Sequence, residues 1–284
     1  MSKAYLKKIR GVIDGIELTE IREKFLSMHK QAEKSFASKD KKSFKQDVEL
    51  IVETAKRDGI KGIRSPGQES FRGTVIAVLL ALFIRGFIVE PFHIPSGSMI
   101  PTLLIRDHLF VTKLSYGIRI PFTTLYLYRY DKPKPSDVVV FINPQKPEED
   151  WIKRVVGIEG DLVEIKNNRL LINGNPVSYS EKVKFKVPAE NGSPSYYAIR
   201  LEEKLSDESN SIIIMGDNTN AANMGPFRVK KDHVFVMGDN RDNSVDSRFI
   251  GQIPISHVIG RALFIWWAGG ENWFNPDRIF DPIR

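Results

Sequence analysis

The apolar segment from Thr74 to Val89 limits what this chain can fold into more than any other feature. It contains 16 residues and one charged side chain, Arg85, near its C-terminal end, where a long side chain can reach lipid headgroups. About 20 apolar residues span a bilayer as a helix, so the segment is at the short end of that range. It lies too late in the chain for a cleaved signal peptide. A buried core helix is the alternative, and we expect residues 73–90 to be a single membrane anchor.

The positive charge of the chain lies almost entirely before this segment. Residues 1–72 carry 17 Lys and Arg against 11 Asp and Glu, which gives +6 of the total net charge of +7. Basic residues mark the cytoplasmic side of membrane helices, so residues 1–72 are predicted to be cytoplasmic and residues 91–284 to be exported across the membrane. A nucleic-acid-binding protein would carry the basic excess on its folded domain, so the lipid bilayer is an expected partner and nucleic acid is not.

Residues 1–72 have the pattern of helices. Ser43 and Gln46 resemble a capping box, and Gly59 suits a helix C-terminus. No pattern in this part predicts chemistry. We interpret it as a helical cytoplasmic extension.

The chain after residue 90 has the pattern of β-strands. Short apolar or alternating runs are separated by Gly, Pro, Asn and Asp. The runs lie at 108–114, 137–142, 151–158, 161–165, 169–174, 211–216, 233–238 and 257–267. Residues 176–215 are more polar and are predicted to be an insertion or subdomain. The predicted fold class is mainly β, as a domain of residues 91–284 after one N-terminal transmembrane helix.

Several kinds of chemistry have no support in the sequence. There is no cysteine, which excludes disulfides, thiolate metal sites and a cysteine nucleophile. Neither a G-x-S-x-G nor an H-E-x-x-H motif occurs. No metal or other cofactor is expected.

A serine-rich turn, Pro95–Thr102, follows the apolar segment closely. Ser96 and Ser98 flank a glycine that permits close approach of a ligand, and prolines on both sides stiffen the backbone. A serine hydroxyl is a weak nucleophile unless a nearby base takes its proton. Taken alone, the stretch is explained at least as well by a rigid turn leaving the membrane.

Lys153 is the candidate base. If residues 150–157 form a strand, alternation places Trp151, Lys153 and Val155 on one face. Burial disfavours the ammonium and lowers the pKa of the amine, which makes a lysine a usable base near neutral pH. Arg154, on the opposite face, stays charged and is expected to be structural. By frequency alone, a solvated lysine on a strand face is the commoner case.

A dense polar loop occupies residues 238–248, with the sequence GDNRDNSVDSR. Its three aspartates and two arginines indicate a fixed network of hydrogen bonds and ion pairs. A calcium loop is the natural alternative. The spacing lacks both the D-x-D-x-D-G pattern and the closing glutamate of such a loop.

Four segments in this order, after a membrane anchor, resemble the type I signal peptidases, the bacterial leader peptidase family. PSGSMIPTL resembles the family's nucleophile segment, SDVVVF its substrate strand, IKRVVGIEGD its lysine segment and GDNRDNSVDSR its terminal segment. They lie at 95–103, 136–141, 152–161 and 238–248. The resemblance covers about residues 74–170 and 230–267, and it leaves residues 1–72 unmatched.

The resemblance implies a catalytic role for two residues. Ser98 would attack the scissile carbonyl carbon and Lys153 would take its proton. The backbone N–H of Ser98 and the hydroxyl of Ser96 would form the oxyanion hole. His93 is an alternative base, because some relatives carry His in place of the lysine. This chain keeps Lys at the matching position, so His93 is expected to be structural.

The resemblance also implies three supporting residues in the polar loop. Ser244 would hold the Lys153 amine in place, and Asp246 and Arg248 would support the site structurally. A neutral hydroxyl suits the first role, because an adjacent carboxylate would raise the pKa of the amine.

The implied substrates are the signal peptides of exported proteins, cut after small residues at the −3 and −1 positions. The substrate would lie extended beside residues 138–141. Candidates for its apolar pockets, each equally well explained by core packing, are Phe92, Ile94, Met99, Val140 and Ile152. The Trp-rich segment 264–274 is suited either to the headgroup layer or to core and turn packing.

Two other functions are weighed against this interpretation. A Ser–Lys self-cleaving repressor shares the catalytic logic, but it predicts a DNA-binding head and no anchor. A membrane-anchored paralogue that binds exported peptides without cutting them predicts a broken Ser–Lys pair. The apolar segment argues against the first, and the presence of both Ser98 and Lys153 argues against the second.

Overall fold

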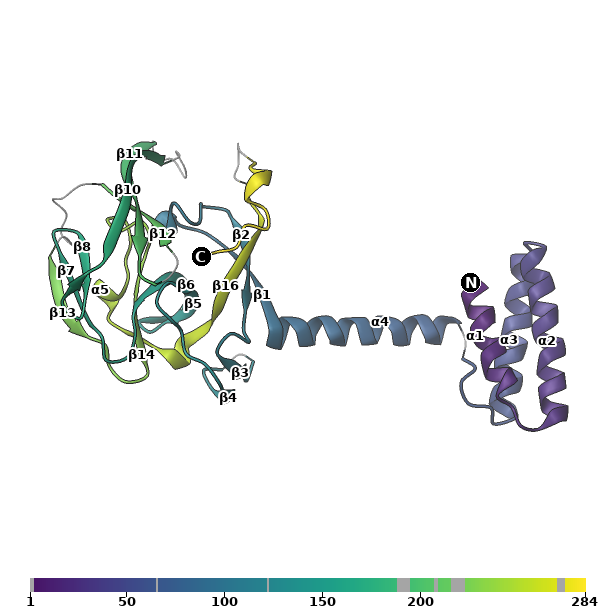
Figure 1. Ribbon diagram of the computed structural model, residues 1–284. Coiled ribbons are helices and arrows are strands. Elements are labelled where there is room, and N and C mark those ends of the chain that lie inside the picture. The colour runs from purple at the N-terminus through teal and green to yellow at the C-terminus, as the bar shows by residue number, and fades with distance from the viewer. Residues whose placement is uncertain are drawn as a thin grey trace. The chain divides into compact units, whose positions relative to one another are not determined.

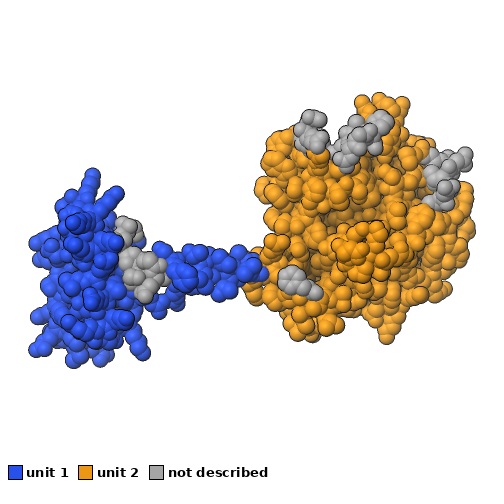
Figure 2. Space-filling model, turned by 180° about the vertical axis from the view of Figure 1, so that it is seen from behind, with its two compact units in different colours: residues 1–82 blue, residues 83–284 orange. Residues whose placement is uncertain are grey.

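The computed structural model describes residues 3–64, 66–121, 123–187, 195–206, 209–215, 223–269 and 274–284. The chain divides into two compact units, residues 1–82 and 83–284, which Figure 2 shows in different colours. Each unit has an apolar core of its own.

The first unit contains three helices packed around one core, α1 (Lys3–Asp14), α2 (Thr19–Ala37) and α3 (Lys41–Arg57), as Figure 1 shows. Apolar residues recur every three or four positions on each helix, which places them on one face. The buried apolar residues are Leu6, Ile9, Ile13, Phe25, Ala32, Phe44, Val48, Ile51, Ala55 and Ile63. The predicted helical character of this part is confirmed.

The N-terminus of α3 differs from the prediction. The side chain of Asp40 caps the helix by accepting hydrogen bonds from the backbone N–H groups of Lys42 and Ser43, at 3.0 and 3.1 Å. The hydroxyl of Ser43 donates to the same carboxylate. The predicted capping box at Ser43 and Gln46 is therefore wrong. Gly59 follows the helix with φ of +69°, as expected at a helix C-terminus.

The apolar segment forms α4 (Pro66–Phe83) and the π-helical turn η1 (Ile84–Ile88). The stretch Ser70–Ile88 is long and apolar enough to cross a membrane, and none of it is buried inside the protein. That exposure contradicts the alternative of a buried core helix. The boundary between the two units falls at residues 82 and 83, so the last turn of the segment belongs to the second unit.

A seven-stranded antiparallel sheet forms the centre of the second unit, in the order β1-β2-β16-β5-β6-β14-β15. Val138 and Val140 of β5 pack in one apolar cluster, whereas Val139 and Phe141 pack in another. Because both faces of β5 are covered, its sequence is an unbroken apolar run. The strands are β1 (Val89–His93), β2 (His108–Thr112), β5 (Val138–Asn143), β6 (Lys146–Gly157), β14 (His233–Met237), β15 (Ile253–Pro254) and β16 (Val258–Trp267).

Three smaller sheets complete the second unit. One contains β13 (Met224–Arg228), β7 (Leu162–Lys166), β8 (Arg169–Ile172) and β9 (Asn175–Pro176). Another contains β10 (Ser178–Val187), β11 (Tyr196–Lys204) and β12 (Ser209–Ile214). A ribbon joins β3 (Gly117–Arg119) and β4 (Tyr126–Arg129). The short helices are η2 (Gly97–Met99), α5 (Ser247–Ile250), η3 (Ile255–His257) and η4 (Pro276–Arg278).

The mainly β fold class is thus confirmed. Each of the predicted apolar runs overlaps a strand, and the polar region 176–215 supplies the β10–β12 sheet. The strands β1, β3, β4, β9, β10, β11, β13 and β15 were not predicted, because their sequences are short, polar or continuous with the anchor. Within the Trp-rich segment, residues 270–273 lie outside the described residues.

Gly260 provides a test of how closely β16 and β2 pack. A Cβ atom at Gly260 would overlap the carbonyl oxygen of Thr112. We expect Gly260→Ala to lower the free energy of unfolding of the second unit by about 1–3 kcal/mol, measured by urea unfolding. Gly11→Ala in α1 is the control, because a Cβ there meets nothing within 4 Å. It is expected to stabilise the first unit by about 0.5–1 kcal/mol. Unchanged stability of Gly260→Ala would contradict the packing.

Candidate active site

The turn that carries Ser98 is held by the polar loop that follows β14. Ser98 lies in η2, shortly after β1. The backbone N–H of Asn240 donates to the Ser98 carbonyl at 3.0 Å. The side-chain amide of Asn240 donates to the Gly97 carbonyl at 3.1 Å. Asn240 therefore fixes the two successive peptide groups of Gly97 and Ser98, which limits where the Ser98 hydroxyl can lie.

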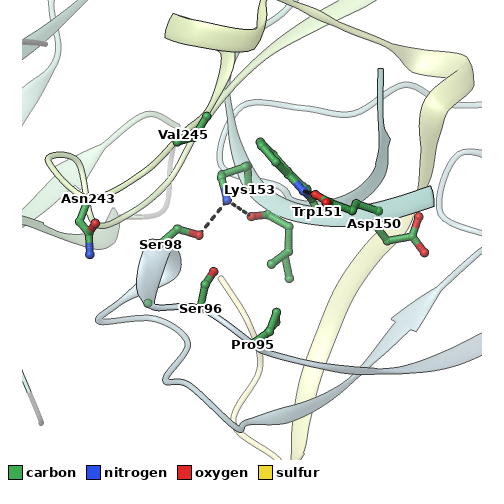
Figure 3. Close-up of a pocket in the computed structure, with 11 residues that line it drawn as sticks. Pro95, Ser96, Ser98, Asp150, Trp151, Lys153, Asn243 and Val245 are labelled. Atoms are coloured by element: carbon green, nitrogen blue, oxygen red, sulfur yellow. Dashed lines mark hydrogen bonds between the residues drawn. The ribbon is translucent and has the colours of Figure 1, made fainter. Parts of the chain in front are cut away.

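Lys153 reaches Ser98 from β6. Its Nζ donates to Ser98 Oγ at 2.7 Å and to the Ile152 carbonyl at 2.9 Å, as Figure 3 shows. When the amine is neutral, the same contact lets the Ser98 hydroxyl donate to Nζ. Lys153 is only 5% exposed, Val155 is buried on the same face, and the Trp151 ring centre is 5.6 Å from Nζ. The predicted alternation along this strand is confirmed.

Burial lowers the pKa of the Lys153 amine to about 8, because an enclosed ammonium loses its hydration. The charges of Asp246 and Asp239 act in the opposite direction. At pH 7, a pKa of about 8 leaves roughly one amine in ten neutral, against about three in ten thousand for an ordinary lysine. Lys153 therefore has the protonation behaviour of a general base near neutral pH.

Buried arginines bind both of these carboxylates. Arg154 follows Lys153 in β6, points to the opposite face and makes two hydrogen bonds of 2.7 Å to Asp239. Arg248 binds the two oxygens of Asp246 at 2.8 Å each. Each guanidinium offsets a negative charge that would otherwise favour the protonated amine. The structural role predicted for Arg154 agrees with this pairing.

A third buried pair links β11 to the polar loop. Arg241 donates to both oxygens of Glu203, from Nη1 at 2.6 Å and from Nη2 at 2.5 Å. Its Nε donates to the Gly238 carbonyl at 3.2 Å. Burial is the largest influence and raises the pKa of Glu203, but the charge of Arg241 and the hydrogen bonds from Arg241 and Tyr179 together lower that pKa below its ordinary value. The sequence did not identify Glu203, because it lies outside every motif and 38 residues before Arg241.

Ser244 packs close to Ser98, and its hydroxyl donates to a carboxylate. Its hydroxyl donates to Asp246 Oδ2 at 2.8 Å. A Cβ atom on Gly238 would overlap both the Ser244 hydroxyl and the Ser98 carbonyl, so both groups pack against the side of Gly238 where a side chain would begin. The Lys153 amine donates to Ser98 and to Ile152. The direct contact of Ser244 with the amine stays a prediction.

Ser98 and Lys153 line a cleft of about 520 Å³. The Ser96 hydroxyl points into it beside the Ser98 hydroxyl and the Lys153 amine (Figure 3). A carbonyl group placed at Ser98 would thus also lie near Ser96. The cleft is lined by Pro95, Ser96, Gly97, Ser98, Glu149, Asp150, Trp151, Ile152, Lys153, Asn243 and Val245.

Of the five predicted pocket residues, Ile152 lines the cleft. Ile94, Met99 and Val140 lie in the core with at most 2% exposure, and Phe92 packs against that core. The apolar pattern could not distinguish a pocket wall from the core behind it. Sequence reasoning assigned no place in the cleft to five other lining residues. Glu149 and Asp150 lie just before the lysine segment, whereas Pro95, Asn243 and Val245 lie inside the quoted segments without a predicted contact to substrate.

His93 lies on β1, opposite His108 of β2. The two rings are 4.9 Å apart, and His93 is not among the residues that line the cleft. These positions agree with a structural role. Within the part of the chain that the structure describes, no group of three or more His, Asp or Glu side chains could hold a metal ion.

Comparison with known proteins identifies the family. A family model described as signal peptidase, peptidase S26, matches residues 68–267. This chain belongs to the signal peptidase family. The match includes Ser98 and Lys153 and leaves the three-helix bundle outside.

Curated signal peptidases are similar over much of their length. Signal peptidase I of Pseudomonas fluorescens is 38% identical over 208 residues, which cover 68% of this chain and 70% of that protein. Signal peptidase I of Pseudomonas aeruginosa is 37% identical over 210 residues, which cover 67% and 69%. Signal peptidase I of Rickettsia typhi is 32% identical over 241 residues, which cover 78% and 88%.

The lowered pKa of Lys153 predicts how the activity of this signal peptidase depends on pH. Because the neutral amine is required, kcat/KM is expected to rise about tenfold per pH unit below about pH 8 and to level off above it. Peptide cleavage measured from pH 5 to pH 10 gives the profile. His93→Ala is the control and should keep the same midpoint. A midpoint near pH 6.5 that disappears in His93→Ala would assign the base to histidine instead.

Asp246→Asn tests the electrostatic effect of this carboxylate on the base. The charge of Asp246 raises the pKa of Lys153, so its removal is expected to move the midpoint of the profile to lower pH. The maximal rate is expected to fall as well, since Asp246 also binds Ser244. Asp242→Asn is the matched control, because Asp242 accepts from the Met215 N–H instead. A midpoint that stays in place or rises would contradict this assignment.

Proposed function

We propose that this protein removes N-terminal signal peptides from exported proteins, as a membrane-bound serine endopeptidase with Ser98 as nucleophile and Lys153 as general base. One observation carries the proposal: a buried amine lies 2.7 Å from a serine hydroxyl inside a cleft, in a chain of the signal peptidase family. The curated relatives named signal peptidase I support the substrate class.

In the first half-reaction, neutral Lys153 accepts the hydroxyl proton of Ser98 while Oγ attacks the carbonyl carbon of the scissile peptide bond. Negative charge develops on the carbonyl oxygen, where the Ser98 backbone N–H and the Ser96 hydroxyl would donate hydrogen bonds. One such donor contributes about 3–4 kcal/mol to lowering the barrier. The ammonium of Lys153 then protonates the leaving amine, the C–N bond breaks, and the signal peptide is held as an ester on Ser98.

In the second half-reaction, water attacks this ester. Lys153 takes a proton from the water, and the ammonium returns it to Ser98 Oγ as the C–O bond breaks. The products are the signal peptide with a free carboxylate and the restored hydroxyl. The protons balance within the Ser98–Lys153 pair, so the reaction needs no cofactor.

The shape of the cleft supports binding of an extended peptide. Residues 95–98 supply one side of the lining and residues 149–153 of β6 the other. An extended chain between two such segments can be held by main-chain hydrogen bonds, with alternate side chains directed into the lining. Ile152 beside Lys153 gives that lining an apolar wall, which suits small residues at the −3 and −1 positions.

The apolar span supports a location in the inner membrane. With Ser70–Ile88 across the bilayer, the basic excess of residues 1–72 favours the cytoplasmic side for the bundle. The β-rich unit would then face the periplasm, where exported preproteins emerge. In the Trp-rich segment, Trp267 is 46% exposed and its ring is 5.0 Å from that of Phe274, which suits the headgroup layer.

The two alternatives have less support. A self-cleaving repressor would not carry an exposed span, and a binding paralogue would not retain a Lys–Ser pair with a lowered amine pKa.

Substitution of the pair tests the proposed mechanism. Ser98→Ala and Lys153→Ala are each expected to lower kcat for a preprotein substrate by about 10⁴-fold or more, because members of a catalytic unit act together. His93→Ala is the control and should retain activity. Circular dichroism and urea unfolding would check that each variant is folded. An active, folded Lys153→Ala variant would overturn the mechanism.

A further inference from the structure

The β10–β12 sheet carries a cavity of about 420 Å³ that is separate from the catalytic cleft. Its lining includes Lys182, Val183, Lys184, Tyr197 and Met215. Val183, Tyr197 and Met215 are 47%, 59% and 49% exposed, so much of the lining is apolar and open to solvent. Single exposed apolar residues are ordinary on protein surfaces, whereas several around one cavity indicate a binding site.

Lysines of β10 give this cavity a positive charge. Lys182, Lys184 and Lys186 are exposed, and the Lys184 amine lies 4.3 Å from the centre of the Tyr197 ring. Among the described residues, none of these lysines forms an ion pair. Lysines on the outer strand of a sheet also discourage pairing with other chains, but that role does not require an apolar cavity beside them. The combination indicates a ligand with both acidic and apolar groups.

Hydrogen bonds to the polar loop fix the position of this cavity relative to the active site. Asn240, which holds the turn that carries Ser98, also donates to the Tyr196 hydroxyl of β11 at 3.3 Å. Asp242, two residues later, accepts from the backbone N–H of Met215 at 2.6 Å. This short chain of contacts places Met215, at one side of the cavity, within roughly 20 Å of Ser98.

The two ends of the catalytic cleft differ in what lies beside them. Asp150 and Asn243 both line the cleft, on opposite sides of the catalytic pair in Figure 3. Asp150 also lines a neighbouring cavity of about 320 Å³, whose lining includes Gly86 near the end of the apolar span. A signal peptide whose apolar part lies in the bilayer would therefore enter at the Asp150 end. The chain beyond the scissile bond would leave at the Asn243 end, beside the part of the polar loop that binds Met215.

We propose that the cavity on the β10–β12 sheet binds the first residues of the mature protein, beyond the scissile bond, and that its lysines favour acidic side chains there. The inference rests on the proposed function. An extended chain covers 20 Å in about six residues, so the bound residues lie at about +4 to +8. Exported segments that follow an apolar stretch contain few Lys and Arg, because basic residues are retained on the cytoplasmic side. A lysine-rich surface therefore meets little repulsion from such segments and attracts each Asp or Glu.

Photo-cross-linking tests the location of the mature segment. Two synthetic peptides run from the signal peptide through position +10, with benzoylphenylalanine at +6 in one and at −5 in the other. Each is mixed with the full-length Ser98→Ala variant, which is expected to bind the peptide without cutting it. After illumination, mass spectrometry identifies the labelled residues. This readout does not depend on cleavage.

We expect the +6 probe to label residues 182–184, 197–199 or 215, and the −5 probe to label residues near the Asp150 end of the cleft. A +6 probe that labels other parts of the chain, or nothing, while the −5 probe labels the cleft would overturn the binding site and leave the proposed function standing. Absence of labelling by both probes would count against the proposed function and this inference together.

Cleavage of matched peptides tests the charge preference. Two peptides differ only in carrying Asp or Asn at +5 and +7, and a third peptide ends at +2. The unsubstituted chain is expected to cleave the Asp peptide with a kcat/KM about three- to fivefold higher than the Asn peptide, mainly through KM, because exposed ion pairs are weak. The Lys182→Glu/Lys184→Glu variant should lose or reverse this preference. High salt should weaken the preference of the unsubstituted chain.

The Lys230→Glu/Lys231→Glu variant is the matched control, because both lysines are exposed and line neither the cleft nor the cavity. It should keep the preference for the Asp peptide, and all three enzymes should cleave the peptide that ends at +2 equally well. The same Asp-to-Asn ratio in both charge-reversed variants would overturn the role of the cavity lysines. Failure of the unsubstituted chain to cleave any peptide would count against the proposed function, whereas the cross-links would still decide the binding site.

Discussion

The hydrogen bond between Lys153 and Ser98 imposes conditions on everything around it. The amine can accept a proton only while it is neutral, so it has to lie where an ammonium is poorly solvated. In such surroundings any unpaired carboxylate would act strongly, because charges interact more strongly at low dielectric. The site holds Asp239 and Asp246 close enough to raise the pKa of Lys153, and each is bound by a buried arginine. The burial of Lys153 and the pairing of Asp239 and Asp246 with arginines therefore both follow from the need for a neutral amine at position 153.

Strand β6 meets this requirement with two adjacent residues. Side chains alternate along a strand, so Lys153 points toward Ser98 while Arg154 points toward Asp239. Residue pairing with β5, in which Val139 lies opposite Lys153, fixes this arrangement. A slip of one residue would exchange the two side chains and place a permanent positive charge at the nucleophile. Buried ion pairs contribute little net stability, so the arginines are better explained by this electrostatic role than by holding the fold together.

The sequence predicted those parts of the structure that depend on local pattern. The apolar runs form strands, and the predicted alternation around Lys153 is confirmed. A two-residue period in the sequence shows which side chains of a strand share a face. Features made by distant contacts were missed. Glu203 contacts Arg241 only because β11 packs against the polar loop. Val140 was predicted to line a pocket, but it lies in the core, and both environments favour the same apolar residue types. Asp40 displaced Ser43 as the cap of α3, since both are good capping residues and only the chain's path decides between them.

The three-helix bundle has a core of its own and lies outside the match to the family. Its three helices bury their apolar residues against one another, and the match to the signal peptidase family begins at residue 68, after the bundle. Among the described residues, the hydrogen bonds that position Ser98 and Lys153 come from the second unit. Residues 1–57 contain 14 lysines and arginines, and none of them is among the buried residues of the bundle. The core of the bundle is apolar apart from His29, Ser35 and Thr54. Exposed ion pairs such as that of Lys24 with Asp58, at 2.7 Å, add little to stability. Folding therefore constrains the surface charge of the bundle only weakly, and that charge is better explained by what the bundle contacts.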